Sequence, residues 1–190
     1  EIDIGGVNIK DIEPKKLNEL VGFVGQDNFL LNLTFKENIK LGNPEASDEA
    51  VEEAAKLAQC HEFITKLPEG YDTNVGSVGD KLSGGEKQRV TIARMILKDA
   101  PIIVLDEATA YVDPDNEQKI QAALNALTQN KTLIVIAHRL STIKQADQII
   151  VLGHQQILEK GDHARLLDMN GQYKQMWDMH IGAKDWGVSS

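Results

Sequence analysis

The chain has 190 residues, of which 42% are hydrophobic and 26% charged, and its formal net charge is -9. This size and composition suit one globular domain, or one domain with a small subdomain, and argue against a fibrous or mostly disordered chain. The acidic balance disfavours a nucleic-acid binder whose affinity depends on a broad basic face. The single cysteine, Cys60, excludes an intramolecular disulfide and a cysteine-rich zinc site, so we expect a core thiol there.

The first part of the chain is predicted to form a hairpin, a strand and then a mostly helical region. Gly5 and Gly6 separate two short extended runs, as in a tight hairpin. Ser47 precedes an acidic first turn, which suits the positive end of a helix dipole. The block 31–78 has no clear buried strand and is predicted to be a helical insertion on a sheet. The expected elements are a hairpin at 2–9, a short helix or turn at 14–20, a strand at 21–24, helices at 35–39 and 47–59, and a turn-rich break at 68–72.

The second part alternates strands with helices. Residues 102–105 are uniformly apolar and 132–137 are apolar after Thr132, and we predict two strands buried on both faces of a parallel sheet. Buried strands that alternate with helices imply an α/β fold with a mostly parallel sheet. The other expected elements are helices at 83–97, 114–127 and 139–145, a hairpin of strands 148–152 and 156–159 around Gly153 and His154, and two short helices near 163–169 and 172–180.

Two acidic residues, Asp106 and Glu107, directly follow the apolar strand 102–105. Open parallel sheets place their ligands at the carboxyl ends of the strands. At that edge Asp106 can hold a magnesium ion, and Glu107 can orient or deprotonate a water that attacks a phosphate. The alternative is a pair of solvated acids at the start of a loop, and this segment alone does not decide between the two.

Residues 82–89 read LSGGEKQR, and Ser83 and Glu86 match a capping box at a helix start. A serine hydroxyl, two glycines with unobstructed N–H groups and a helix N-terminus together form an anion site. An ordinary capped helix explains Ser83 and Glu86, but it leaves Gly84 and Gly85 without a reason.

Five motifs in the same order resemble those of the ATP-binding-cassette (ABC) ATPases, and the resemblance covers essentially the whole chain. Residues 82–89 resemble the signature motif, usually LSGGQ, with Glu86 in place of glutamine, and residues 102–107 resemble the Walker B motif. The remaining matches are Gln26 with the Q-loop glutamine, Asp113 with the D-loop aspartate and His138 with the switch histidine.

The resemblance implies a role for each of these residues. Asp106 would support Mg²⁺, Glu107 would be the catalytic base, and His138 would contact the γ-phosphate of ATP. Gln26 would reach the metal ion and couple to the membrane partner. The residues expected at the nucleotide are Ser83, Gly84, Gly85, Glu86 and Asp113, with the signature acting on ATP held by a second nucleotide-binding domain in a head-to-tail dimer.

Three of these residues also have a purely structural explanation. Gln26 alone is more often a surface glutamine than a ligand, and His138 after an apolar strand is usually a hydrogen-bonded structural histidine. Asp113 is explained as the N-cap of the helix that begins with Pro114. Their order and spacing favour the functional interpretation.

The family pattern also predicts the domain organisation. The ATPase core is expected in residues 1–26 and 101–160, the helical subdomain in 27–100 and C-terminal helices in 161–190. The sequence contains no G-x-x-x-x-G-K-[ST] P-loop, which the family carries upstream. We therefore expect an N-terminally truncated nucleotide-binding domain that alone binds ATP weakly and is inactive.

Residues 26–34 and 67–73 resemble cassettes of exporter type, which serve multidrug, lipid or siderophore-linked transporters. In that family the cassette is fused behind transmembrane helices, so the parent is expected at the cytoplasmic face of the cell membrane, with no nucleic-acid partner. A soluble ABC ATPase of DNA repair or translation is the alternative. Only residues 27–82, which are 56 residues, separate Gln26 from Ser83, and this short spacing favours a transporter. A non-catalytic fragment of a disrupted gene is a third interpretation and is compatible with the first.

Overall fold

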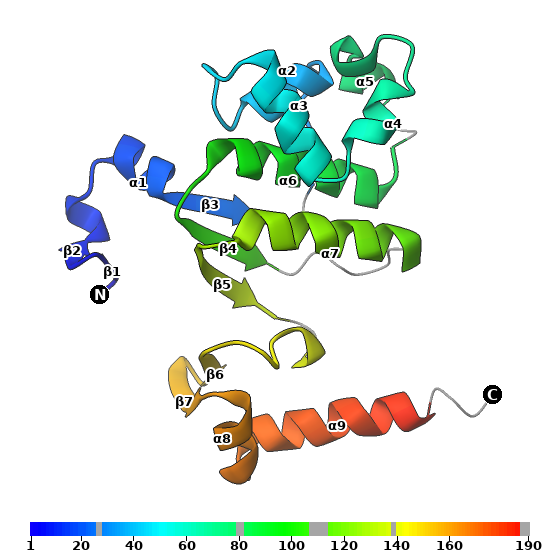
Figure 1. Ribbon diagram of the computed structural model, residues 1–190. Helices are drawn as coiled ribbons and strands as arrows, with labels where there is room; N and C mark the ends of the chain where they lie inside the picture. The colour runs from blue at the N-terminus through cyan, green and yellow to red at the C-terminus, as the bar shows by residue number, and fades with distance from the viewer. Residues whose placement is uncertain (26–27, 79–81, 107–113, 138–139, 187–190) are drawn as a thin grey trace. The chain divides into compact units, whose positions relative to one another are not determined.

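The computed structural model describes residues 1–25, 28–78, 82–106, 114–137 and 140–186 (Figure 1). The chain divides into two compact units, Glu1–Ile136 and Ala137–Ser190. This division by compactness differs from the predicted domain boundaries at residues 26, 100 and 160, which rest on the family pattern and stay a prediction.

The first unit begins with the predicted hairpin. Strand β1 (Asp3–Ile4) pairs antiparallel with β2 (Val7–Asn8). Gly5 and Gly6 make the turn with φ values of 59° and 81°, a backbone conformation that favours glycine. A 3-10 turn, η1 (Ile9–Asp11), and helix α1 (Pro14–Leu20) follow, with proline at the first turn of α1.

The predicted parallel sheet is present in the first unit. Its strands are β3 (Val21–Val24), β4 (Ile102–Asp106) and β5 (Thr132–Ile136), and β4 lies in the middle. Val24 pairs with Leu105, and Asp106 pairs with Ile136. The three strands therefore end at one edge of the sheet, with Asp106 at the end of the central strand.

The prediction that both 102–105 and 132–137 are buried on two faces is wrong, most clearly for β5. In β5, Leu133 is 42% exposed and Ile134 and Ile136 are each 50% exposed. Among the described residues, the core cluster of this unit includes Val24 of β3 and Ile103 of β4 but no residue of β5. The physical reason is that, among the described elements, β5 packs mainly against β4, and an apolar sequence is buried only where another element covers it.

The block between β3 and β4 is helical, as predicted. Its elements are α2 (Phe35–Lys40), α3 (Asp48–Leu57), α4 (His61–Thr65), the 3-10 turn η2 (Gly70–Asp72), α5 (Val75–Val78) and α6 (Gly84–Lys98). The Ser47 hydroxyl oxygen accepts a hydrogen bond from the Ala50 N–H at 3.2 Å and so caps α3. Helix α6 packs against α2, α3, β3 and α7 (Pro114–Thr128), and it is the central helix of the unit (Figure 1).

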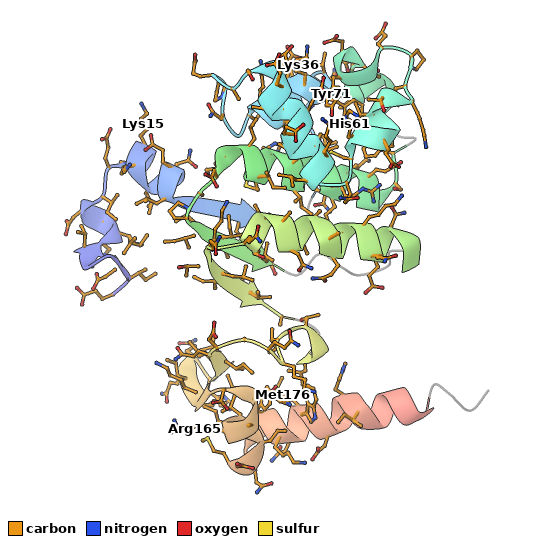
Figure 2. All side chains as sticks on the ribbon, in the orientation of Figure 1. Lys15, Lys36, His61, Tyr71, Arg165 and Met176 are labelled. Atoms are coloured by element: carbon orange, nitrogen blue, oxygen red, sulfur yellow. The ribbon has the colours of Figure 1, made fainter. Side chains whose placement is uncertain are left out.

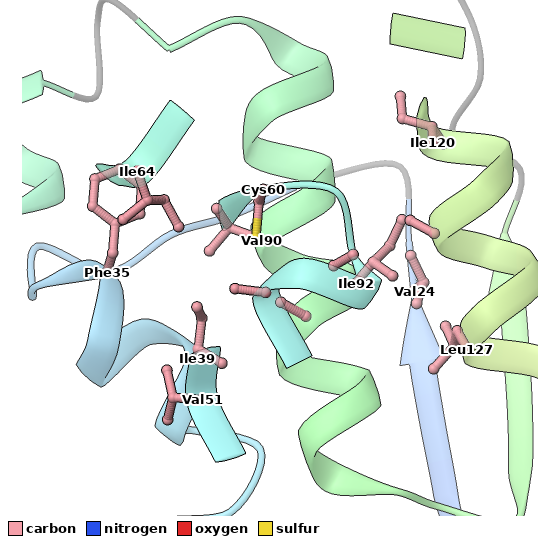
Figure 3. Packing of buried hydrophobic residues seen from close by; sticks show 14 of the residues in the cluster. Val24, Phe35, Ile39, Val51, Cys60, Ile64, Val90, Ile92, Ile120 and Leu127 are labelled. Atoms are coloured by element: carbon pink, nitrogen blue, oxygen red, sulfur yellow. The ribbon is translucent and has the colours of Figure 1, made fainter. Parts of the chain in front are cut away.

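The core of the first unit lies between these helices and the sheet. Phe35 and Ile39 of α2, Ile64 of α4 and Val90 of α6 are fully buried around Cys60 (Figure 3). Burial raises the pKa of the Cys60 thiol to about 12, which keeps it uncharged at neutral pH. Cys60 is therefore the core thiol that the sequence predicted.

The second unit consists of a hairpin and two helices. Strand β6 (Ile149–Gly153) pairs antiparallel with β7 (Gln156–Gly161), and the helices are α8 (His163–Asp168) and α9 (Gln172–Trp186). The Glu159 carboxylate accepts the N–H groups of Gln172 and Tyr173 and so fixes the start of α9.

Three predictions in the second unit need correction. The expected helix at 139–145 is a short 3-10 turn, η4 (Leu140–Thr142), in the described residues. The hairpin turn lies at His154 and Gln155, both with positive φ, one residue later than predicted, because Gly153 still pairs with Gln156 as part of β6. Helix α9 continues to Trp186, since one glycine in residues 181–186 does not end a helix that no proline interrupts.

Candidate functional site

The signature segment forms the start of helix α6. The Ser83 hydroxyl oxygen accepts the N–H of Glu86 at 3.2 Å, and the Glu86 carboxylate accepts the N–H of Ser83 at 2.8 Å. This is the predicted capping box. A hydroxyl has one hydrogen and two lone pairs, so a Ser83 oxygen that accepts from Glu86 keeps its own hydrogen for another acceptor.

The two glycines of this turn have different surroundings. A Cβ atom added at Gly85 would lie 3.3 Å from Cβ and Cγ of Asn116 in α7, so the close packing of α6 on α7 explains this glycine. A Cβ atom added at Gly84 would meet nothing within 4 Å, and Gly84 does not need a positive φ. Packing therefore accounts for Gly85, while Gly84 leaves an open approach to the first-turn N–H groups, which have no acceptor within the helix.

Two residues that the sequence analysis did not single out join α6 to α7. The Arg89 guanidinium, on a residue that is 3% exposed, donates from Nη1 to Oδ1 of Asn116 at 2.5 Å. The same guanidinium lies 5.6 Å from the ring centroid of Phe63, within the range of a cation–π contact. Glu86 and Arg89 also line a cavity of about 540 Å³ between α3, α4, α6 and α7. Arg89 and Asn116 are far apart in the sequence, and no local pattern pairs them.

A second contact that the sequence did not predict joins His61 and Tyr71. His61 and Tyr71 face each other in the helical region (Figure 2), and Nδ1 of His61 is 2.9 Å from the Tyr71 hydroxyl. Burial raises the pKa of Tyr71, so the hydroxyl stays protonated. This contact joins α4 to the 3-10 turn η2.

The carboxyl edge of the sheet carries the predicted metal ligand. Asp106 is the last residue of β4 and is half-buried there. The other predicted residues follow the same strand ends in the sequence, Gln26 after β3, Glu107 after β4 and His138 after β5, and Asp113 precedes α7. These four lie outside the described residues, so their predicted roles stay predictions.

The described donors are compatible with a magnesium–nucleotide complex. In the part of the chain that the structure describes, no three His, Cys, Asp or Glu side chains gather to hold a metal ion. Magnesium bound to a nucleotide takes one or two carboxylates and fills its shell with phosphate oxygens and water. Asp106 offers one such carboxylate, and the open first turn at Gly84 suits a phosphate group.

A family model described as ABC transporter matches residues 1–110, which is more than half of the chain. The chain belongs to the ABC transporter family. The family predicted from the five motifs is thus confirmed.

Similar proteins narrow the type of transporter. The mycobactin import ATP-binding/permease protein IrtA of Mycolicibacterium smegmatis is 52% identical over 177 residues, which cover 93% of this chain and 20% of that protein. A Staphylococcus aureus protein named for multidrug export, also an ATP-binding/permease protein, is 49% identical over 179 residues, 94% of this chain and 31% of that protein. A solved bacterial Atm1-family ABC exporter with ATP bound has a TM-score of 0.82 and 45% identity, and the match covers 92% of this chain and 30% of that one.

This chain spans about a fifth to a third of the length of these relatives. The two curated relatives are named as ATP-binding/permease proteins, one for import and one for export, so they do not favour a soluble ABC ATPase; the solved structure is an ABC exporter, as the exporter interpretation expects. Within the described residues of this chain, no helix combines the length and the apolar character that a bilayer crossing needs.

Proposed function

We propose that these residues are part of the motor of an ABC exporter, which couples ATP hydrolysis to the transport of a substrate across a membrane. The observation that carries the proposal is the open first turn of α6. There the N-cap residue Ser83 presents a hydroxyl, and the unobstructed Gly84 leaves first-turn N–H groups open to an anion. The resemblance to fused ATP-binding/permease proteins supports it.

The anion at this turn is the phosphate end of ATP held by a second nucleotide-binding domain. Ser83 donates its hydroxyl hydrogen to a phosphate oxygen, since its oxygen already accepts from Glu86. Gly84 and Gly85 contribute first-turn N–H groups. Glu86 keeps the turn in shape through its bond to the Ser83 N–H, at the cost of a negative charge near the phosphate.

The sheet edge acts at the other nucleotide site of the head-to-tail pair, at the ATP that this domain itself holds. Asp106 would hold Mg²⁺, which would neutralise phosphate charge there. Glu107 accepts a proton from the attacking water, and His138 contacts the γ-phosphate. Gln26 would reach the metal ion and couple to the transmembrane partner, and Asp113, which precedes α7 in the sequence, would act at the nucleotide. The signature turn of the second domain closes this site against bulk water.

The rest of the protein is expected to supply the phosphate cradle and the transmembrane helices. These 190 residues contain no P-loop motif, so on their own they bind ATP weakly and hydrolyse it negligibly. The motor then works at the cytoplasmic face of the membrane, in a head-to-tail pair of nucleotide-binding domains fused to transmembrane segments.

The test uses the full-length product of the gene that encodes this chain, reconstituted in liposomes. Glu107→Gln should keep ATP binding and lower turnover by about 100-fold or more, because a general base contributes about 10²–10⁴. Glu45→Gln, on an exposed loop residue, is the matched control and should keep full turnover. Undiminished turnover in Glu107→Gln would overturn the assignment of the base.

Calorimetry on the isolated 190 residues tests the other part of the proposal. We expect no ATP binding tighter than about micromolar. Submicromolar affinity would show that the described residues hold the nucleotide without a P-loop, and the proposed division of the site would be wrong.

A further inference from the structure

The side chain of Asn38 in α2 is fully buried and holds the loop that precedes its own helix. Its amide nitrogen donates to the backbone carbonyls of Leu31 at 3.0 Å, Leu33 at 3.3 Å and Thr34 at 3.0 Å. Its Oδ1 accepts the Leu31 N–H at 2.9 Å. One side chain thus fixes the path of residues 31–34, in the segment 28–34 that follows Gln26 in the sequence.

Asn38 is in turn held by Arg94 of helix α6. Nε of Arg94 donates to the backbone carbonyl of Asn38 at 2.9 Å, and Nη2 donates to Oδ1 of Asn38 at 3.2 Å. Arg94 is half-buried, which lowers the pKa of its guanidinium, and hydrogen bonds from a charged donor are stronger than those from a neutral one.

The backbones of the same two elements also touch. A Cβ atom added at Gly42, just after α2, would lie 2.1 Å from the carbonyl oxygen of Arg94. No side chain fits between them, so the end of α2 packs directly on the backbone of the C-terminal part of α6. Arg94 and Ser83 are on one continuous helix and cap, about three turns apart.

We propose that Asn38 and Arg94 are positioning residues of the ATPase site, which set segment 28–34 and the signature turn of α6 in one fixed relation. The inference rests on the proposed function. A displacement of segment 28–34 should move α6 as well, because Asn38 and Arg94 bond the two together. The first turn of α6, with Ser83 and Gly84, should then move with the helix. Neither residue touches the nucleotide.

The competing explanation is that the pair only stabilises the fold. Thr91 provides the matched control, because it is buried on the same helix and its hydroxyl donates to the Lys87 carbonyl at 3.2 Å, within α6. Thr91→Val removes a buried polar contact of α6 without touching segment 28–34. A merely structural loss should affect Thr91→Val and the Arg94 variants alike.

The first experiment measures steady-state ATP hydrolysis of the full-length gene product in liposomes, with kcat expressed per ATP-binding site titrated in each variant. Arg94→Ala should lower kcat per site by about tenfold or more, because small misplacements cost up to about 100-fold, and should change ATP affinity less than about twofold. Thr91→Val should keep kcat per site. Equal kcat per site in Arg94→Ala and wild type would overturn the proposal.

A second pair of variants guards against misfolding and tests the linkage. Arg94→Lys keeps a charge and one donor and should lose less activity than Arg94→Ala. Asn38→Ala and Arg94→Ala should not be additive, since either one breaks the same connection. Additive losses would show that the two residues act independently, and the proposal would fail.

Hydrogen exchange of the same full-length protein separates this inference from the proposed function. In Arg94→Ala, peptides covering residues 28–34 and 82–90 should gain exchange together, whereas Thr91→Val should not change 28–34. Faster exchange confined to one of the two segments would overturn the linkage. This readout needs no ATP hydrolysis, so it decides the inference even if the wild-type protein proves to have no ATPase activity.

Discussion

The substitution Gly84→Ala should affect the stability of the protein and its contact with phosphate in opposite directions. The residue is exposed at the first position of α6, it does not require a positive φ, and an added Cβ atom would meet no atom within 4 Å. Alanine restricts the unfolded chain more than glycine does and suits a helix better. The substitution should therefore stabilise the protein while its methyl group obstructs the approach of a phosphate.

The size of the effect follows from these surroundings. A compatible glycine-to-alanine change stabilises by about 0.4–1 kcal/mol, which for a chain of this length raises Tm by about 1–4 °C. The neighbouring Gly85→Ala is the matched contrast. Its Cβ atom would lie 3.3 Å from Asn116, so Asn116 must move and its bond to Arg89 is disturbed. Overpacking of this kind costs about 1–3 kcal/mol.

Differential scanning calorimetry of both variants, with ATP hydrolysis of the full-length protein in parallel, checks the prediction. Gly84→Ala should show a raised Tm and a turnover that falls about tenfold or more, on the scale of losing one oriented donor. Gly85→Ala should show a lowered Tm. A clear fall of Tm in Gly84→Ala would refute the open surroundings of this residue, and unchanged turnover would refute phosphate contact at this turn.

Two further predictions concern the helical region. The Cys60 thiol is buried, and its pKa is raised to about 12. Mass spectrometry should show that it resists iodoacetamide at neutral pH in the folded chain and reacts fully in guanidinium chloride. Rapid alkylation of the folded chain would contradict the burial. The pKa of Glu37 is lowered below 4.5, chiefly by the hydrogen bond from the Thr34 N–H and then by the Thr34 hydroxyl, so its stabilising effect is present above that pH and is lost as pH falls through the folded-state pKa. The Tm difference between wild type and Glu37→Ala should shrink on acidification below about pH 4.5, and a constant difference would contradict the assignment.

Local signals in the sequence were sufficient for most of the helix and turn boundaries. Ser83 and Glu86, three residues apart, specify the start of α6, and the structure has both of their hydrogen bonds. The same pattern at Thr34 and Glu37 also forms a capping box, which could have been predicted and was not. A capping box depends only on residues that are close in the sequence, so it can be predicted from a single sequence.

Features that depend on distant parts of the chain could not be predicted in this way. Arg89 meets Asn116 across 27 positions, and Arg94 meets Asn38 across 56 positions. The exposed side chains of β5 show the same limit, because an apolar segment does not specify which element covers it. The roles of Gln26, Glu107, Asp113 and His138 stay predictions from the family pattern.

The length of α6 has a mechanical consequence. Ser83 and Arg94 are eleven positions apart, which is about 16 Å along a helix axis. A tilt of only about 4° around the Arg94 end would carry the Ser83 hydroxyl sideways by about 1 Å, enough to change a hydrogen bond into no bond. A small rotation of helix α6 about its Arg94 end thus becomes a large displacement at its first turn.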